Sequence, residues 1–288
     1  MALNFSVLKV RTISAVIFAA IMIGGILWNQ WSFFALFTII QLGCLFEYQK
    51  LMRIIFPEYA LINKLHQWGV LVLGLFTTVA LASLPYAYKG VSLTTYATYG
   101  VIGVAVIILL ADLVSKKINF KAYLVSAVGI IYISMGLSLI FQLRAMMSNT
   151  FVGDIGYTIP LILIVSIWVN DTAAYLVGSL IGRRPLSSIS PNKTWEGALG
   201  GILFTLILGY IIGAYINKGE ELFWMVSALI IAPCSIYGDL LESLFKRSLN
   251  IKDSGTILPG HGGILDRFDA ALFAIPFFYS WAMLYLYW

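Results

Sequence analysis

Nine stretches of about 20 mostly apolar residues follow one another along the chain, and this pattern limits the possible folds more than any other feature. An α-helix rises about 1.5 Å per residue and the hydrocarbon core of a bilayer is about 30 Å thick, so a crossing helix needs about 20 such residues. The stretches are 12–28, 32–52, 67–85, 94–114, 121–143, 157–181, 196–216, 222–241 and 268–287. The sequence therefore predicts an all-α, polytopic integral membrane protein with about nine transmembrane helices.

The composition excludes an ordinary soluble domain. Of the 288 residues, 60% are hydrophobic and 11% are charged, against about 45–50% and about 25% in soluble globular proteins. A soluble protein of this size has no core large enough to hide that much apolar surface, whereas a bilayer covers it.

The basic residues predict the orientation of the helices. With the N-terminus inside, only three of the 18 Lys and Arg residues fall on outside segments, namely Lys89, Arg144 and Lys218. Inside segments of membrane proteins are enriched in Lys and Arg. We therefore expect a protein of the inner (cytoplasmic) membrane, and we assign the net charge of +5 to topology rather than to nucleic-acid binding.

Polar groups are distributed unevenly between the two halves. Ten of the 13 acidic residues follow position 150. We expect one integrated membrane domain in which helices of residues 1–150 are a lipid-facing scaffold and helices of residues 151–288 carry a catalytic site on the cytoplasmic side. A stripe of small residues at every fourth position allows close helix approach in lipid, and packing within the chain is favoured over a subunit interface. The stripe consists of Gly197, Gly201, Thr205, Gly209 and Gly213. A homodimer is left open.

Asp171 is the clearest charged residue at membrane depth. It lies ten residues before the inner end of stretch 157–181, which corresponds to a depth of roughly 15 Å. Because a charge in the bilayer centre costs at least about 2.5–3.5 kcal/mol, such residues face a cavity or a partner. Asp171 is therefore either a buried carboxylate satisfied by helix–helix hydrogen bonds or part of the wall of a water-accessible cavity.

The segment before stretch 196–216 has the composition of a phosphate-binding helix start. Ser190 is a candidate N-cap with Pro191 at the first helical position. A helix N-terminus presents free N–H groups and positive charge to an anion, and Lys193 and Thr194 stand beside it. Arg183 and Arg184 fit topology anchoring equally well.

The segment from Asp239 to Asp269 is rich in charged residues and contains a glycine-rich turn at residues 259–263. Asp239 and Glu242, and likewise Asp266 and Asp269, are three residues apart, so each pair lies on one helix face. Carboxylates beside Lys, Arg and exposed backbone amides are typical of a Mg²⁺-polyphosphate site. The alternative interpretation of this segment is a charged loop in contact with solvent. The sequence contains no Walker A pattern. No Ser-His-Asp set can be argued, since His261 is the only histidine among charged residues. His66, at a helix boundary, is expected at the membrane interface.

Residues 243–269, SLFKRSLNIKDSGTILPGHGGILDRFD, resemble the defining motif of the phosphatidate cytidylyltransferases, also called CDP-diacylglycerol synthases. Two shorter segments agree in order: DTAAY at 171–175 and SPNKTWEG at 190–197. The resemblance implies the reaction of CTP with phosphatidate in the bilayer to give CDP-diacylglycerol and pyrophosphate with Mg²⁺. A second, monovalent cation is left open.

The resemblance and the residue chemistry together give a set of site residues. Metal ligands are expected at Asp239, Asp266 and Asp269. Asp239 and Asp266 are also counted as catalytic, with cations to neutralise phosphates and the leaving pyrophosphate at Lys246, Arg247, Lys252 and Arg267. Substrate binding is expected at Lys193, Thr194, His261, Gly262, Gly263 and Asp171.

Two other functions remain open at this point. The nearer alternative is another CTP-dependent lipid enzyme, such as a polyprenol kinase or an isoprenoid-ether lipid cytidylyltransferase. The farther alternative is a cation-coupled transporter, which intramembrane Asp171 would suit. Transporters often consist of repeated halves, and the asymmetry of this chain argues against one.

Overall fold

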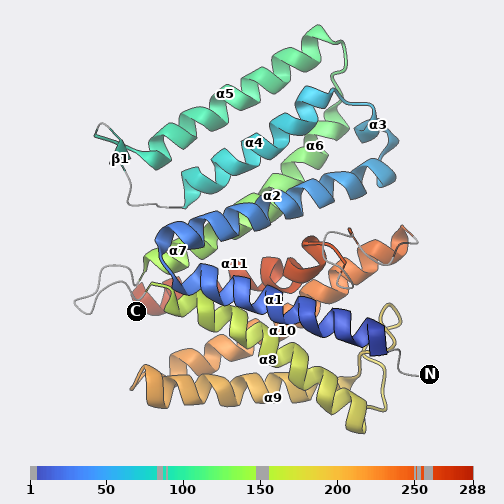
Figure 1. The fold of residues 1–288 in the computed structure, drawn as a ribbon. Coiled ribbons are helices and arrows are strands. Elements are labelled where there is room, and N and C mark those ends of the chain that lie inside the picture. The colour runs from blue at the N-terminus through green and yellow to red at the C-terminus, as the bar shows by residue number, and fades with distance from the viewer. Residues whose placement is uncertain are drawn as a thin grey trace. The chain divides into compact units, whose positions relative to one another are not determined.

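The computed structural model of the protein is almost entirely helical (Figure 1). It describes residues 5–82, 87–88, 90–146, 156–249, 251, 254–255 and 262–287. The helices are α1 (Phe5–Leu27), α2 (Gln30–Ile55), α3 (Pro57–Ala60), α4 (Lys64–Leu81), α5 (Leu93–Val114), α6 (Phe120–Gly129), η1 (Ile130–Met135), α7 (Gly136–Ala145), α8 (Thr158–Ile181), α9 (Trp195–Ile211), η2 (Ile212–Ile216), α10 (Glu221–Ser248) and α11 (Leu265–Tyr287).

Among the described residues, eight helical segments are long and apolar enough to cross a membrane, and Thr12–Leu27 in α1 is a shorter apolar helix. The π-helical segments η1 and η2 continue neighbouring α-helices, so that Phe120–Ala145 and Trp195–Ile216 each form one candidate span. The prediction of an all-α polytopic membrane protein with about nine helices is therefore confirmed.

The chain forms two compact units. The N-terminal unit consists of Met1–Tyr157 and Asp253–Arg267, and the C-terminal unit consists of Thr158–Lys252 and Phe268–Trp288. The segment 253–267 belongs to the second half of the sequence but packs with the helices of the first half. The sequence-based division at residue 150 stays a prediction.

In the N-terminal unit, a tight connection joins the first two helices. Helix α1 ends at Leu27, and Asn29 is the N-cap of α2 because its side chain accepts hydrogen bonds from the backbone N–H groups of Trp31 (2.8 Å) and Ser32 (2.9 Å). A short antiparallel hairpin of β1 (Ala87–Tyr88) and β2 (Val91–Ser92), which the sequence did not predict, precedes α5. Gly90 turns it with a φ of +80°.

His66 corrects one expectation from the sequence. It is 1% exposed rather than interfacial, because the first turn of α4 faces α5 and α6. The Nδ1 atom lies 2.5 Å from Asp112 Oδ2, and the Nε2 atom lies 3.0 Å from Ser126 Oγ. Tyr123 donates a further hydrogen bond to Asp112 (2.8 Å). A Ser-His-Asp arrangement therefore exists, fully buried, and it links three helices of this unit.

In the C-terminal unit, the small-residue stripe of α9 and η2 packs within the chain, as predicted. A Cβ atom at Gly201 would lie 2.6 Å from Asn170 Oδ1 on α8, and one at Gly209 would lie 2.5 Å from the carbonyl oxygen of Trp224 on α10. The first half of the stripe thus contacts α8 and the second half contacts α10. Close approach compensates for the absence of a hydrophobic driving force between helices in lipid.

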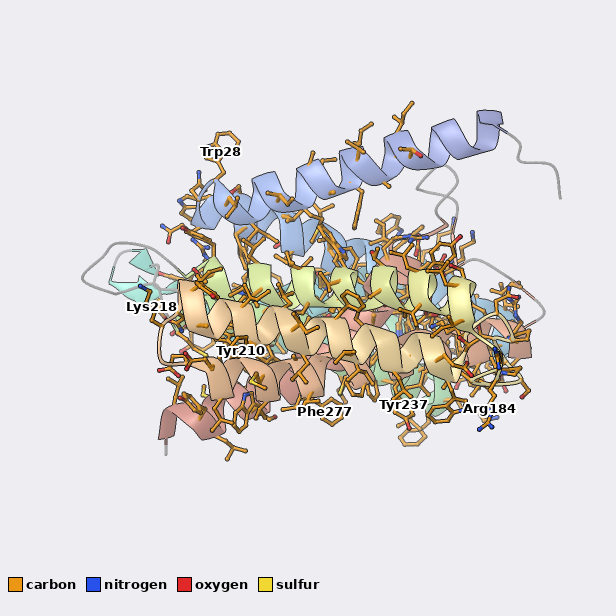
Figure 2. All side chains as sticks on the ribbon, turned by 90° about the horizontal axis from the view of Figure 1, so that it is seen from below. Trp28, Arg184, Tyr210, Lys218, Tyr237 and Phe277 are labelled. Carbon is orange, nitrogen blue, oxygen red and sulfur yellow. The ribbon has the colours of Figure 1, made fainter. Side chains whose placement is uncertain are left out.

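Basic residues of the loops before and after the α9 segment lie at its opposite ends. Figure 2 shows Arg184 and Lys218 at opposite ends of the α9 segment, with Tyr237 and Phe277 on the outer surface of the unit. Helix α10 continues to Ser248, seven residues past the predicted end at 241. The extension is about two helical turns long. It carries Lys246 and Arg247 at the helix C-terminus, where basic side chains interact favourably with the helix dipole.

Candidate active site

A cavity of about 430 Å³ opens between α8, α9 and α10 of the C-terminal unit. Its polar wall includes Asp171 and Tyr175 from α8, Lys193 and Thr194 from the preceding loop of α9, and Asp239 from α10. Four of these were singled out from the sequence, and they come from three separate segments. Asp171 is exposed to this space rather than buried between helices. A charged side chain at membrane depth thus faces a polar cavity, as its insertion cost requires.

Lys193 and Asp239 form an ion pair on the cavity wall. The side chains are 31% and 40% exposed, so both are accessible to a ligand entering the cavity. Ser243, one turn further along α10, donates a hydrogen bond to the other carboxylate oxygen of Asp239 at 3.3 Å. The pair therefore presents one cation and one oriented carboxylate side by side.

The loop that carries Lys193 is held by backbone hydrogen bonds. Leu186 N–H donates to the carbonyl oxygen of Lys193 at 2.7 Å, and Trp195 N–H donates to that of Arg184 at 3.0 Å. Both backbone N–H groups of Arg183 and Arg184 also donate to Glu196, at 3.1 and 3.2 Å. This segment therefore places Lys193 on the cavity wall through a folded loop.

The N-cap of α9 is Thr194, not Ser190. The Thr194 hydroxyl accepts a hydrogen bond from Gly197 N–H at 3.1 Å, and α9 begins at Trp195. The sequence expectation was wrong because the backbone bonds above hold residues 190–193 in a turn and prevent an earlier helix start. The helix N-terminus still lies at the cavity, since Thr194 and Gly197 both line it.

A second group of charged residues connects α10 and α11. Asp269 is 8% exposed, and its carboxyl group lies close to that of Glu242. Lys246 lies 3.2 Å from the other side of this pair, at Glu242 Oε2. Gly238 makes the close packing possible, because a Cβ atom there would lie 2.6 Å from the backbone oxygen of Asp269. Helices carrying Asp239 and Asp269 thus approach each other next to those residues.

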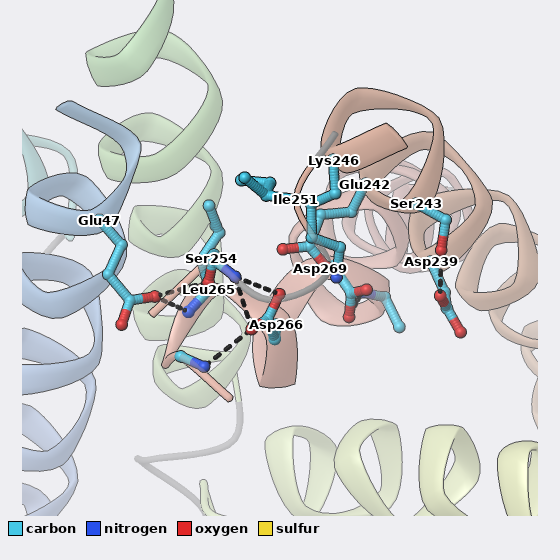
Figure 3. A network of polar contacts seen from close by, with 12 residues as sticks. Glu47, Asp239, Glu242, Ser243, Lys246, Ile251, Ser254, Leu265, Asp266 and Asp269 are labelled. Carbon is cyan, nitrogen blue, oxygen red and sulfur yellow. Dashed lines mark hydrogen bonds and ion pairs between the residues drawn. The ribbon is translucent and has the colours of Figure 1, made fainter. Parts of the chain in front are cut away.

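In the N-terminal unit, Asp266 binds the backbone of the glycine-rich segment (Figure 3). Its carboxylate accepts hydrogen bonds from Ser254 N–H at 2.9 Å and from Gly263 N–H at 2.8 Å. Gly262 has a φ of +78°, which favours glycine. Asp266 lies in the first turn of α11, so it fixes the segment that leads into its own helix.

The other predicted site residues are more peripheral. Arg247 is exposed and donates to the carbonyl oxygen of Ile251 at 3.3 Å. Arg267 is exposed on the first turn of α11. Lys252 and His261 lie outside the described residues.

The donor atoms at this site fit a hard divalent cation. Mg²⁺ takes oxygen ligands and is usually held by one or two carboxylates together with substrate phosphates. Asp171 and Asp239 offer carboxylate oxygens to one cavity, and Asn170 Oδ1, buried beside it, has no hydrogen-bond partner among the residues that the structure describes. A carboxylate has about four acceptor sites, of which Lys193 and Ser243 occupy two at Asp239. Within neither unit do three of the described His, Cys, Asp or Glu side chains cluster as a ready-made metal cage.

Comparison with known proteins decides the family. The model of the Cytidylyltransferase family matches residues 9–285, which is nearly the whole chain. The chain belongs to the Cytidylyltransferase family. The matched range includes all residues that line the cavity, and also Asp266 with its partners Ser254 and Gly263.

Several curated relatives in this family are phosphatidate cytidylyltransferases. The chain is 42% identical over 120 residues to the one from Helicobacter pylori strain J99, covering 42% of this chain and 45% of the relative. It is 34% identical over 180 residues to that of Staphylococcus epidermidis strain RP62A, covering 62% and 66%. It is 47% identical over 117 residues to that of Bacillus subtilis strain 168, covering 40% and 44%. These alignments thus span at most 66% of each relative's length.

Two buried polar residues, Asn170 and Glu47, are not among the site residues predicted from the sequence. Asn170 is fully buried and donates to Ser235 on α10 at 2.9 Å, so it fixes α8 against α10 behind Asp171. Glu47 on α2 is 1% exposed and binds the segment before α11. A signal for Glu47 was present, since an ionisable residue inside an apolar span marks a partner or a functional site.

Proposed function

We propose that this chain is a phosphatidate cytidylyltransferase, which converts CTP and phosphatidate into CDP-diacylglycerol and pyrophosphate. The observation that carries the proposal is the cavity where Lys193 and Asp239 meet beside the N-terminus of α9. Family membership and relatives of that name support it. A site for this reaction must accept a water-soluble nucleotide and a lipid phosphate, and a polar cavity among membrane helices meets both needs.

In the proposed reaction, a phosphate oxygen of phosphatidate attacks the α-phosphorus of CTP, and the bond from that phosphorus to the pyrophosphate oxygen breaks. The lipid phosphate is itself a competent nucleophile, so no protein base is required. The protein has to bring two anions together, and catalysis then depends on positioning and charge. Lys193 and the first N–H groups of α9 hold phosphate in the cavity. Lys246, Arg247, Lys252 and Arg267 are proposed to neutralise the remaining phosphates and the pyrophosphate.

We further propose that the enzyme is Mg²⁺-dependent, with Asp239, Asp266 and Asp269 as ligands and Asp171 supporting them. Mg²⁺, when bound, would supply positive charge to stabilise the charge that develops on the leaving group. Asp239 on α10 reaches the cavity, and Asp266 and Asp269 lie three residues apart on one face of α11. His261, Gly262 and Gly263 are proposed to contact a phosphate. A second, monovalent cation would be an addition to this set.

The proposed location is the inner membrane, with the site facing the cytoplasm, where CTP is available. The loop with Arg183, Arg184 and Lys193 belongs to the basic side predicted from the sequence. No nucleic-acid partner is proposed, and a homodimer remains a prediction.

The test is incubation of purified full-length protein with phosphatidate vesicles, Mg²⁺ and CTP labelled either in the cytosine or in the γ-phosphate. We expect the cytosine label in the lipid and the γ-label in pyrophosphate, with EDTA abolishing both. Transfer of only the γ-label to a lipid would identify a kinase instead. Polyprenol and an isoprenoid-ether lipid phosphate, used in place of phosphatidate, test the neighbouring activities.

A further inference from the structure

Glu47 is a buried carboxylate on α2 that binds a segment more than 200 residues away in the sequence. Its Oε2 atom accepts hydrogen bonds from Ser254 Oγ (2.9 Å) and Leu265 N–H (2.8 Å). Its Oε1 atom accepts one from Ile264 N–H at 3.0 Å. Both oxygens are therefore satisfied, which a carboxylate that is 1% exposed requires. Figure 3 shows Glu47 reaching this segment from its helix.

The hydrogen bonds of Glu47 determine where α11 starts. The first N–H groups of any α-helix lack partners within the helix, and Leu265 is the first residue of α11. Glu47 supplies an acceptor to Leu265 and to the residue before it. Its negative charge also lies at the positive end of the helix dipole, where it is stabilising. Glu47 thus caps α11 from another helix.

The same contact reaches Asp266 through Ser254. The Ser254 hydroxyl donates to Glu47, whereas its backbone N–H donates to Asp266 at 2.9 Å. Gly263, which donates to Asp266 at 2.8 Å, is also next to Glu47. Ser254 thus donates to both carboxylates, and Gly263 lies next to both.

Glycines around Glu47 allow this close contact. A Cβ atom would lie 2.3 Å from Glu47 Oε1 at Gly255 and 2.2 Å from Glu47 Oε2 at Gly263. On α2, one turn before Glu47, a Cβ atom at Gly43 would lie 2.4 Å from Ile264 Cδ1. Three glycines therefore permit the carboxylate and the segment to approach each other.

We infer that Glu47 is a positioning residue of the active site, which holds Ser254, Ile264 and Leu265 so that Asp266 is correctly oriented for the divalent cation. The inference rests on the proposed function, because Asp266 is a proposed ligand there. Residues that orient metal ligands typically change metal affinity or activity about 10–100-fold when they are mutated. Glu47 would act in this way without touching either substrate.

Glu47→Gln is the most direct variant because it keeps the shape of the side chain. In either orientation, its amide NH₂ group faces the backbone N–H of Ile264 or of Leu265, so one donor loses its acceptor. Ser254→Ala removes one of the three bonds and is a milder change. Gln41→Leu is the matched control, since Gln41 is buried on the same helix and donates to Ser134 at 2.8 Å, away from this segment.

The experiment measures turnover, the Mg²⁺ concentration for half-maximal activity, and hydrogen exchange at Ile264 and Leu265 in purified full-length protein. For Glu47→Gln we expect activity about 10–100-fold lower or a Mg²⁺ half-saturation raised by that factor, with faster exchange at both amides. Ser254→Ala should show the same pattern with a smaller change. Gln41→Leu should leave Mg²⁺ dependence unchanged even if it unfolds at a lower temperature.

Wild-type Mg²⁺ dependence and turnover per folded molecule in Glu47→Gln would overturn the inference, as would an equal Mg²⁺ shift in Gln41→Leu. If Glu47→Gln does not fold, Glu47→Asp and Ser254→Ala decide, and unchanged Mg²⁺ dependence in both overturns it. If the wild-type protein is inactive on phosphatidate, the proposed function fails. In that case, unchanged exchange at Ile264 and Leu265 in Glu47→Gln still refutes the role of Glu47.

Discussion

Lys193 pairs with Asp239 across two segments that are 46 residues apart, one a loop and the other a long membrane helix. The loop is folded by its own backbone bonds, and the helix is fixed by close packing at Gly238. Neither residue is buried, so the pair is available to a ligand. This combination of a rigid frame and accessible charge is what a site for anionic substrates requires.

Replacing Lys193 should reduce catalysis more than stability. We expect Lys193→Met to lower kcat/KM for CTP by about 100-fold, since loss of one group that stabilises transition-state charge costs about 10²–10³. Steady-state pyrophosphate release measures it. Lys218→Met, at the opposite end of the α9 segment, is the control and should behave like the wild type. Equal activity in both variants would remove Lys193 from the site.

Asp266→Asn should leave the protein folded and inserted yet remove nearly all CTP-dependent activity. The amide oxygen can occupy the position of Oδ2, which accepts the two shorter bonds from Ser254 and Gly263, whereas the negative charge needed for Mg²⁺ is lost. Activity assays together with size-exclusion chromatography in detergent separate the two effects. Wild-type turnover in this variant would dismiss Asp266 as a ligand.

The glycine stripe of α9 should be sensitive to single methyl groups. In Gly209→Ala the new Cβ atom meets a backbone oxygen of Trp224 at 2.5 Å, which cannot move independently of α10. We expect a loss of about 1–3 kcal/mol in unfolding free energy, seen as a lower unfolding temperature in detergent. Gly103→Ala on α5 is the matched change, because no atom lies within 4 Å of its new Cβ. A fall of equal size in Gly103→Ala would contradict the packing argument.

The buried pair of His66 and Asp112 should contribute to stability. Removing one partner of a buried hydrogen bond leaves the other polar group unsatisfied, which costs about 1–3 kcal/mol. We therefore expect His66→Ala to lower the unfolding temperature markedly. Ser115→Ala, which removes an exposed hydroxyl next to the same helix end, should change it little. An unaltered unfolding temperature in His66→Ala would show that the pair is unimportant for folding.

The sequence predicted the membrane helices well because each apolar stretch is a local property of the chain. It also singled out Asp171, Lys193, Thr194 and Asp239, which line one cavity, since charged residues in lipid and a long motif are visible without coordinates. The start of α9 was placed too early because Ser190 and Thr194 are both good N-caps, and backbone bonds from Leu186 decide between them. His66 was placed at the interface and Glu47 was not singled out, because their partners are distant in the sequence. The apolar surroundings of Glu47 mark it as a residue with a partner, but no local pattern shows which residues it binds.

The position of Glu47 has a consequence for how the protein can be divided. Its two bonds to backbone amides join α2 to residues 217 and 218 positions later in the chain. A shortened gene that begins at α8 would encode the complete signature from 243 to 269 but not the acceptor for Ile264 and Leu265. The signature alone therefore lacks the buried carboxylate that accepts hydrogen bonds from the first residue of α11 and from the residue before it.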